Sequence, residues 1–150
     1  MMQMERINNL ENKMKRFPNE IIRWTSQNLR NYPWRDNRTL YRVFIAEFFL
    51  QRTKADQVMS VYPEFIQKYP ESHKLFEAKV DELQYFFNKL GLHKRIQYLI
   101  DIISSLKEKN KKIETLEEQE LSDLKGIGKY SINAIKCFAL NQRVPLLDSN

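Results

Sequence analysis

Apolar side chains recur every three or four positions over most of the chain, which is the spacing of one face of an α-helix. The pattern is clearest from Ile96 to Leu106, and it also runs from Met4 to Phe17. From Val43 to Leu50 the residues are apolar almost without a break, which predicts a helix buried on nearly all sides. The expected helices cover residues 4–17, 19–29, 40–51, 80–89, 96–106, 116–124 and 129–140, with a further helix that starts near residue 53 and includes residue 65.

Residues with special backbone preferences mark several helix ends. A proline interrupts the helical hydrogen-bond ladder, so Pro18 is expected to end the first helix and Pro63 to kink or split the helix that Thr53 opens. Thr39 precedes the most apolar helix, where its side chain is placed to act as an N-cap. Gly91 follows the helix over residues 80–89 and suits the position just after a helix end.

Composition narrows the fold class. Only 3 of the 150 residues are Gly, which argues against an all-β protein because such a fold needs frequent turns. With 42% hydrophobic residues, including 9 Phe and 7 Tyr, a single helical domain can bury a substantial core. One Cys cannot close an internal disulfide or build a cysteine metal site within this chain. We therefore expect an all-α protein.

The sequence has neither a signal-peptide core near its start nor an apolar run of about 20 residues that could span a membrane. We expect an intracellular location, cytoplasmic and nucleoid-associated in a prokaryote or nuclear in a eukaryote.

The 25 Lys and Arg outnumber the 19 Asp and Glu, giving a formal charge of +6. This charge favours a polyanionic partner such as nucleic acid, although a basic surface can also serve solubility alone.

Two glycines lie close together between two expected helices, in the segment Gly126-Ile127-Gly128. A hairpin this tight needs positive φ at its glycines. Its amides would point outward at the start of the next helix, where they could bind a phosphate. An ordinary helix–helix turn fits the Gly-x-Gly pattern equally well.

Glu47 is the one charged residue inside the apolar stretch 43–50. Burying a carboxylate costs several kcal/mol unless it is paired or protonated. One interpretation is an ion pair with a nearby arginine. The other is a functional acid, since burial raises the pKa of a carboxyl group toward the range that a general acid needs.

The last residues, Leu147-Asp148-Ser149-Asn150, have the pattern of a helix N-cap with no helix after it. We therefore expect a truncated chain in which residues 148–150 begin a helix that is missing. Asp148 is either that cap or a second functional carboxylate held at a helix start.

Together these features resemble the helix-hairpin-helix DNA glycosylases, especially the branch that holds the MutY-type adenine glycosylases and the archaeal thymine mismatch glycosylases. Glu47 and Asp148 are 101 positions apart, which fits the family. The residues that carry the resemblance are Pro33-Trp34-Arg35, Tyr41-Arg42, Glu47, Leu50-Gln51-Arg52-Thr53, Gly91 with Arg95, residues 124–130 and residues 147–150.

The resemblance implies a single catalytic domain over residues 1–150. In this arrangement residues 1–30 form N-terminal helices of a second lobe, and residues 31–147 form a six-helix barrel core with the hairpin at 124–130. The family's C-terminal segment, in which four cysteines bind a [4Fe–4S] cluster, lies outside this sequence. We expect no cofactor within this chain, and such a cluster only if the native protein continues beyond Asn150.

The resemblance also assigns roles to individual residues. Glu47 matches the general acid and base, Asp148 the catalytic aspartate, and Asn150 a residue close to both carboxylates. Tyr130 stands where lysine-using relatives form a Schiff base, which implies a monofunctional enzyme. The other implied site residues are Gln51 and Arg52 as the wedge that fills the space of an extruded base, Gly126, Gly128 and Lys129 as phosphate ligands, and the backbone carbonyls of Ser122, Leu124 and Ile127 as ligands of an alkali-metal ion.

The expected function is therefore that of a monofunctional DNA glycosylase of base excision repair. It would hydrolyse the N-glycosidic bond of adenine opposite guanine or 8-oxoguanine, or of thymine opposite guanine. The expected partner is double-stranded DNA with a mismatched or damaged base, bound by a monomer without a membrane. The alternatives are a non-catalytic helix-hairpin-helix DNA-binding module and an inactive truncated fragment. A pure binding module has no need of two carboxylates, so Glu47 and Asp148 together favour the enzyme.

Overall fold

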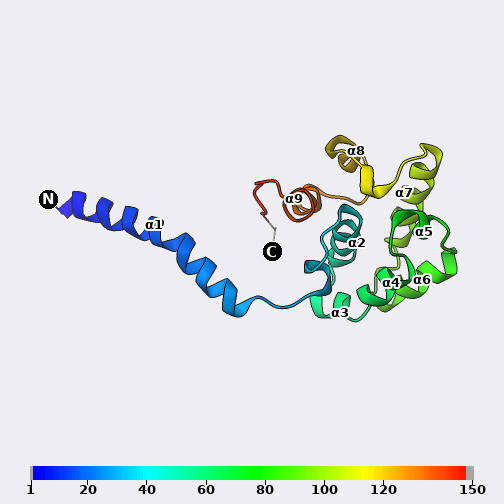
Figure 1. Cartoon of the computed structure of the whole chain (residues 1–150), viewed down its shortest axis with the longest axis horizontal. Helices are drawn as coiled ribbons and strands as arrows, with labels where there is room; N and C mark the ends of the chain where they lie inside the picture. The colour runs from blue at the N-terminus through cyan, green and yellow to red at the C-terminus, as the bar shows by residue number, and fades with distance from the viewer. Residues whose placement is uncertain (1, 148–150) are drawn as a thin grey trace. The chain divides into compact units, whose positions relative to one another are not determined.

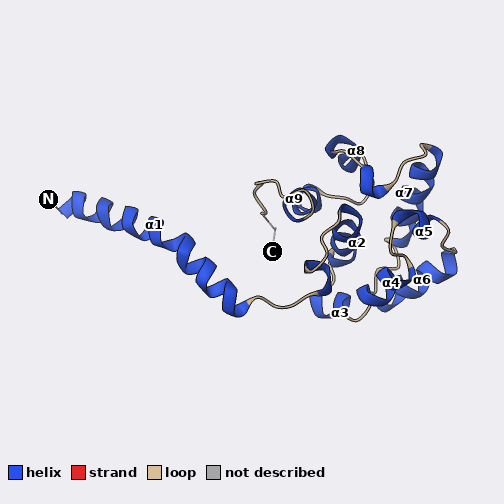
Figure 2. Cartoon of the chain, in the orientation of Figure 1, coloured by secondary structure: helices blue, strands red, loops and turns tan. Residues whose placement is uncertain are grey.

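The structure is a computed structural model that describes residues 2–147, with side chains from Lys13 onward. Every regular element among these residues is helical, which confirms the expected all-α class (Figures 1 and 2). The elements are α1 (Met2–Asn28), η1 (Pro33–Arg35), α2 (Leu40–Leu50), α3 (Ala55–Met59), α4 (Tyr62–Lys68), α5 (Ser72–Phe76), α6 (Val80–Lys89), α7 (Ile96–Glu108), η2 (Ile113–Thr115), α8 (Glu118–Ser122) and α9 (Lys129–Phe138), where η marks a 3₁₀ turn. Contacts between residues divide the chain into two units, 1–31 and 32–150.

The first unit contains α1, which continues through Pro18. The expected helix end before Pro18 is therefore wrong. A proline removes one hydrogen bond and crowds the preceding turn, which bends a helix more readily than it ends one when the residues on both sides favour the helix. The apolar spacing does continue beyond Pro18, because Ile21 and Trp24 follow Phe17 at steps of four and three.

In the second unit, α2 is the central element, and it packs against α9, α3, η1 and η2 (Figure 1). Thr39 caps it as expected, since the Thr39 hydroxyl accepts a hydrogen bond from the Arg42 amide at 3.3 Å. Of its eleven residues, only Arg42 and Leu50 are not buried. The prediction of a helix covered on nearly all sides is confirmed, and Glu47 is buried with it.

The core beside α2 consists of interlocked aromatic rings. The Phe65 ring on α4 meets Phe49 of α2 at 5.0 Å and Phe86 of α6 at 5.1 Å, both edge to face. Phe49 in turn meets Phe87 of α6 at 5.7 Å. Edge-to-face pairs add to the free energy of burial because the positive ring edge faces the negative ring face. This packing holds α2, α4 and α6 together.

The expected helix is split into α3 and α4 just before Pro63, which lies in the first turn of α4, where no amide is needed. The predicted helix start at Thr53 is wrong, because Lys54 occupies the N-cap position of α3. The Thr53 hydroxyl is buried and has no hydrogen-bond partner among the described residues. The cap signal fails here because Thr53 faces inward while the chain turns after α2.

Candidate functional site

The predicted hairpin is present between α8 and α9, two helices that contact each other. Gly126 has a φ of +83°, the left-handed conformation that glycine tolerates best. Gly128 has a φ of −91° and serves as the N-cap of α9, so the expectation of positive φ at both glycines is wrong for Gly128. One left-handed residue is enough to reverse the chain, because Gly128 has an extended backbone, with a ψ of 168°, that leads into the helix.

The two glycines make a matched pair for mutation. A Cβ on Gly126 would lie 3.0 Å from the Tyr98 ring and would add a left-handed penalty, whereas a Cβ on Gly128 would meet nothing within 4 Å. We expect Gly126→Ala to lower the free energy of unfolding by about 1–2 kcal/mol, the usual cost of left-handed backbone at a residue with a Cβ. Gly128→Ala is expected to change it by less than half as much. Urea unfolding of both variants measures the difference, and equal losses would contradict this account of the hairpin.

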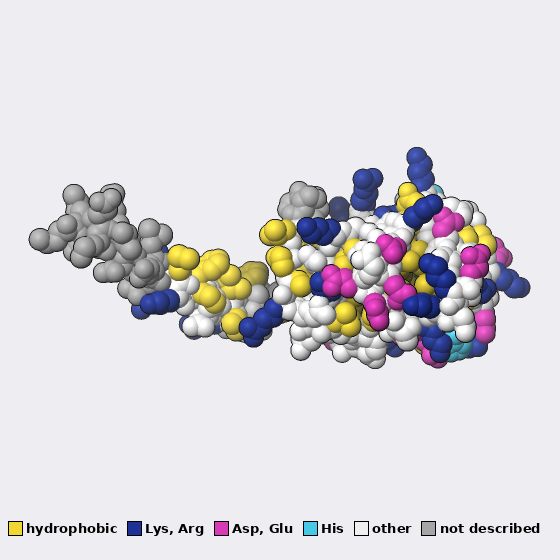
Figure 3. Space-filling view, turned by 90° about the horizontal axis from the view of Figure 1, so that it is seen from above, with side chains coloured by type: hydrophobic (Ala, Val, Ile, Leu, Met, Phe, Trp, Pro, Cys, Tyr) yellow, Lys and Arg dark blue, Asp and Glu magenta, His cyan; other side chains and the backbone are white. Residues whose placement is uncertain are grey.

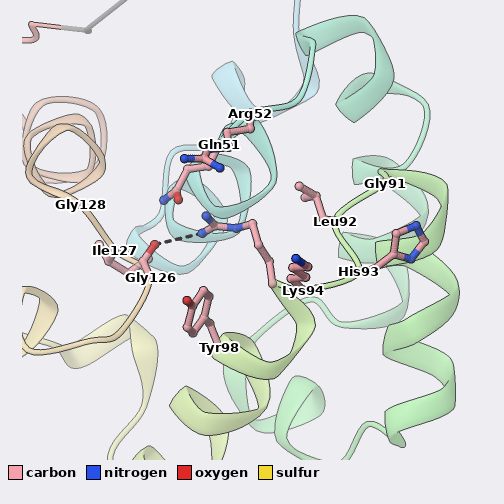
Figure 4. Close-up of a pocket in the computed structure, with 11 residues that line it drawn as sticks. Gln51, Arg52, Gly91, Leu92, His93, Lys94, Tyr98, Gly126, Ile127 and Gly128 are labelled. Carbon is pink, nitrogen blue, oxygen red and sulfur yellow. Dashed lines mark hydrogen bonds between the residues drawn. The ribbon is translucent and has the colours of Figure 1, made fainter.

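A pocket of about 810 Å³ opens beside the hairpin. Three loops and the start of α7 line it, so residues far apart in the sequence meet there (Figure 4). Its cationic side chains, Arg52, Lys94 and Arg95, give it the sign of charge that attracts phosphate. The lining residues are Gln51, Arg52, Gly91, Leu92, His93, Lys94, Arg95, Tyr98, Gly126, Ile127 and Gly128.

The two predicted wedge residues lie at one rim of this pocket, directly after α2. The side-chain amide of Gln51 donates a hydrogen bond to the buried Ser131 hydroxyl at 3.0 Å, which links the end of α2 to the first turn of α9. Arg52 has a φ of +62°, a conformation that is uncommon outside glycine. At the pocket rim, the side chain of Gln51 is therefore held by a hydrogen bond, and the backbone of Arg52 has a left-handed conformation.

Arg95 also lines this pocket, at the N-cap position of α7. Its Nη2 donates a hydrogen bond to the Gly126 carbonyl at 3.0 Å, drawn as the dashed line in Figure 4. Its guanidinium carbon is 4.7 Å from the centre of the Phe48 ring on α2, a cation–π contact. Burial lowers the pKa of the Arg95 guanidinium, and the positive charge of Arg52 acts in the same direction.

Glu47 lies in the last turn of α2 and is 7% exposed. Its position is four residues before Gln51, so one short segment carries both the buried carboxylate and a residue of the pocket rim. Tyr130 lies in the first turn of α9, which packs against α2, and is 39% exposed. Asp148 and Asn150 lie outside the described residues, so their predicted proximity to Glu47 stays a prediction.

The remaining predicted residues surround the hairpin. Lys129 is exposed at the first position of α9 but is not one of the residues lining the pocket. Ser122 is the last residue of α8, and the Leu124 carbonyl accepts a hydrogen bond from the Ile127 amide at 3.3 Å. Their roles as metal ligands stay predictions. Among the side chains described, from residue 13 to 147, no group of three or more His, Cys, Asp or Glu could hold a metal ion.

Sequence reasoning gave no role to three residues that the structure places at the site. Ser131 fixes Gln51, Tyr98 covers Gly126, and Arg95 binds the hairpin carbonyl. These contacts span 80, 28 and 31 positions of sequence, so no local pattern reveals them. The one local signal in the sequence was the spacing of Arg95 and Tyr98, which are three positions apart and therefore lie on the same side at the start of α7.

On one face of the second unit, charges of both signs are interspersed. Figure 3 shows Lys and Arg side chains among Asp and Glu side chains on one face of the second unit. No helix in the described part of the chain combines the length and the apolar character that a membrane span requires.

No family model matches the chain. Comparison with individual proteins finds clear similarity. The chain is 31% identical over 135 residues to an adenine DNA glycosylase of Buchnera aphidicola subsp. Acyrthosiphon pisum, which covers 89% of this chain and 39% of that protein. It is 30% identical over 122 residues to a thymine-DNA glycosylase of Aeropyrum pernix, which covers 81% of this chain and 55% of that protein.

A solved structure of a thermostable thymine-DNA glycosylase superposes with a TM-score of 0.81 at 25% sequence identity, covering 93% of this chain and 65% of that one. The fold is therefore shared over nearly the whole of this sequence. The chain spans between 39% and 55% of the length of the two curated relatives.

Proposed function

Because the chain belongs to the helix-hairpin-helix DNA glycosylase superfamily, we propose that it forms the core of a monofunctional mismatch DNA glycosylase. The observation that carries this proposal is the pairing of a buried carboxylate with a cationic pocket. Glu47 lies in the last turn of α2, and the residues directly after this helix, Gln51 and Arg52, line the pocket that the hairpin completes. A binding module would need the hairpin but not the buried acid.

The reaction we propose is hydrolysis of the bond between a base and its deoxyribose. As this bond breaks, negative charge develops on the base and positive charge on the sugar. A protonated Glu47 would donate its proton to the departing base and, as a carboxylate, then accept a proton from the attacking water. An ionised Asp148 would stabilise the positively charged sugar, so the two carboxylates divide the work as they do in glycoside hydrolysis.

Access to the base requires that it leave the helical stack. We propose that Gln51 and Arg52 fill the space it vacates, since both lie at the pocket rim directly after the helix that carries Glu47. The substrates proposed are adenine opposite guanine or 8-oxoguanine and thymine opposite guanine, in duplex DNA bound by a monomer. A panel of duplexes that differ only in this pair distinguishes the two bases.

Two inorganic groups bear on this proposal, an alkali-metal ion and an iron–sulfur cluster. We propose that the backbone carbonyls of Ser122, Leu124 and Ile127, at the end of α8 and in the following turn, hold an alkali-metal ion, because a helix end leaves carbonyls without helical partners. Such an ion would add positive charge beside a bound phosphate. An iron–sulfur cluster does not fit the described residues, whose one cysteine is the half-buried Cys137.

Duplex binding should depend on salt if the hairpin contacts phosphate. We expect the logarithm of affinity to fall with the logarithm of salt concentration by about 0.9 per phosphate contact. Lys129→Ala should reduce that slope by about one, because the residue lies at the first position of α9 beside the hairpin amides. Fluorescence anisotropy over a salt series measures the slope. An affinity independent of salt would contradict the nucleic-acid interface.

The product distinguishes a monofunctional enzyme from a bifunctional one. Tyr130 has no amine with which to form a Schiff base, so we expect an abasic site whose strand breaks only after alkali treatment. Borohydride should trap no covalent protein–DNA adduct. Tyr130→Lys provides the matched variant, and adduct formation by this variant alone is the expected result. A trapped adduct with the parent chain would overturn the monofunctional assignment.

A further inference from the structure

Arg95 makes a contact that joins two parts of the site. It precedes α7, yet its Nη2 donates a hydrogen bond to the carbonyl of Gly126, 31 positions later, at 3.0 Å. The Gly126 carbonyl belongs to the hairpin turn itself, so the side chain of one loop fixes the backbone of another. The dashed line in Figure 4 marks this bond beside the labelled Tyr98.

The surroundings of the Arg95 guanidinium do not suit a residue whose only role is to stabilise the fold. The group lies over Phe48 at 4.7 Å and near Tyr98 at 6.0 Å, and its Nε is buried with no hydrogen-bond partner among the described residues. An unpaired donor on a desolvated cation costs free energy, and an apolar side chain of similar length would fill the same space without that cost. The presence of an arginine here therefore calls for a reason other than packing.

The bond determines which way the hairpin backbone faces. With the Gly126 carbonyl held by Arg95, the amide of the same peptide, on Ile127, turns to the Leu124 carbonyl at 3.3 Å. The Tyr98 ring covers the other side of Gly126. The first amides of the ten-residue helix α9 follow directly, and helix starts carry amides without helical partners. These amides are the donors that a phosphate can accept.

We propose that Arg95 is a positioning residue for DNA recognition. Its guanidinium holds the Gly126 carbonyl inward, so that the amides at the start of α9 are already oriented for a DNA phosphate before DNA arrives. This role rests on the proposed function, in which the hairpin binds DNA. It extends that function by naming a residue that acts on DNA through the hairpin, and it links the hairpin to Phe48, the residue after Glu47.

Three variants test the role. Arg95→Met removes the charge and the hydrogen bond while keeping an unbranched stem, and Arg95→Lys keeps the charge without the planar fork. Lys107→Met is the matched control, because it removes the same charge from the exposed last turn of the same helix. Each protein is measured for affinity to a duplex with one G·T pair, for base release at saturating protein, and for urea unfolding.

We expect Arg95→Met to weaken duplex affinity about tenfold, the usual effect of losing a hydrogen bond from a charged group. Its unfolding midpoint should equal or exceed that of the parent, because the half-buried cation with its unpaired Nε is gone. Base release at saturating protein should stay within about threefold of the parent, since Arg95 orients the hairpin and not the reacting base. Lys107→Met should weaken affinity by less than about twofold, and Arg95→Lys should remain at least about threefold weaker than the parent.

Other results would contradict either the positioning role of Arg95 or the proposed function. Parent affinity in Arg95→Lys, or equal losses in Arg95→Met and Lys107→Met, would mean that charge alone matters and that Arg95 has no positioning role. A fall in unfolding midpoint parallel to the loss of affinity would mean that Arg95 is merely structural. A parent chain that binds duplex but releases no base from any mispair would overturn the proposed catalysis, while the affinity comparison would still decide the role of Arg95. A parent chain that does not bind duplex DNA would overturn both.

Discussion

Glu47→Gln is expected to slow base release from a mismatched duplex by at least about a hundredfold, the usual contribution of a positioned proton donor. Glutamine keeps the shape of the side chain in its buried position at the end of α2 but cannot supply the proton. Single-turnover release, with protein in excess over duplexes carrying G·T, A·G or A·8-oxoguanine pairs, measures the effect. Duplex affinity should stay close to that of the parent, because Glu47 is buried and does not line the pocket.

Two further variants accompany Glu47→Gln, one at the second proposed catalytic carboxylate and one as a control. Asp148→Asn should slow release by a similar factor, since asparagine caps a helix as well as aspartate but lacks the charge that faces the developing cation. Glu64→Gln removes a carboxylate that is 50% exposed on α4, and its release rate should match that of the parent. If release were unchanged in Glu47→Gln, the catalytic assignment would fail and Glu47 would be a structural residue.

The second large effect concerns folding. Phe65→Ala is expected to lower the free energy of unfolding by about 3–5 kcal/mol, the usual loss for a buried phenylalanine. The ring is fully buried and meets Phe49, Tyr69 and Phe86 within 5.1 Å. The loss is a large part of the roughly 5–15 kcal/mol by which most domains are stable. Urea unfolding monitored by circular dichroism measures it.

Phe138→Ala is the matched control for the core substitution. Phe138 is 40% exposed at the end of α9, so the same change in side chain should cost no more than about 1 kcal/mol. Similar losses at the two positions would contradict the aromatic core described for α2, α4 and α6.

The sequence was most informative where local chemistry and burial coincide. The bounds of α2 could be predicted because Thr39 is a good cap and because the apolar run is too dense for a surface helix. The same run made Glu47 conspicuous, and its burial is confirmed. The hairpin was found from two glycines, although the φ of Gly128 was not, since a Gly-x-Gly pattern does not say which residue makes the turn.

The periodicity of the sequence does not predict contacts between segments that are far apart in the chain. The contact of Arg95 with Gly126 depends on where the core places α7 and the hairpin, and that of Gln51 with Ser131 depends on how α2 packs against α9. The expected helix end at Pro18 was wrong for a different reason, because here the sequence did contain the relevant signal. A single residue rule was given more weight than the apolar spacing that continues on both sides of it.

Arg52 shows how selection for stability and selection for activity can conflict at one position. Its left-handed backbone, with a φ of +62°, suits glycine better than arginine by about 1 kcal/mol. Directed evolution for heat resistance alone would therefore enrich glycine at this position and discard the guanidinium that reaches the pocket. A screen that also required binding to DNA would retain the arginine, so the residue recovered at position 52 would report which pressure had acted on the chain.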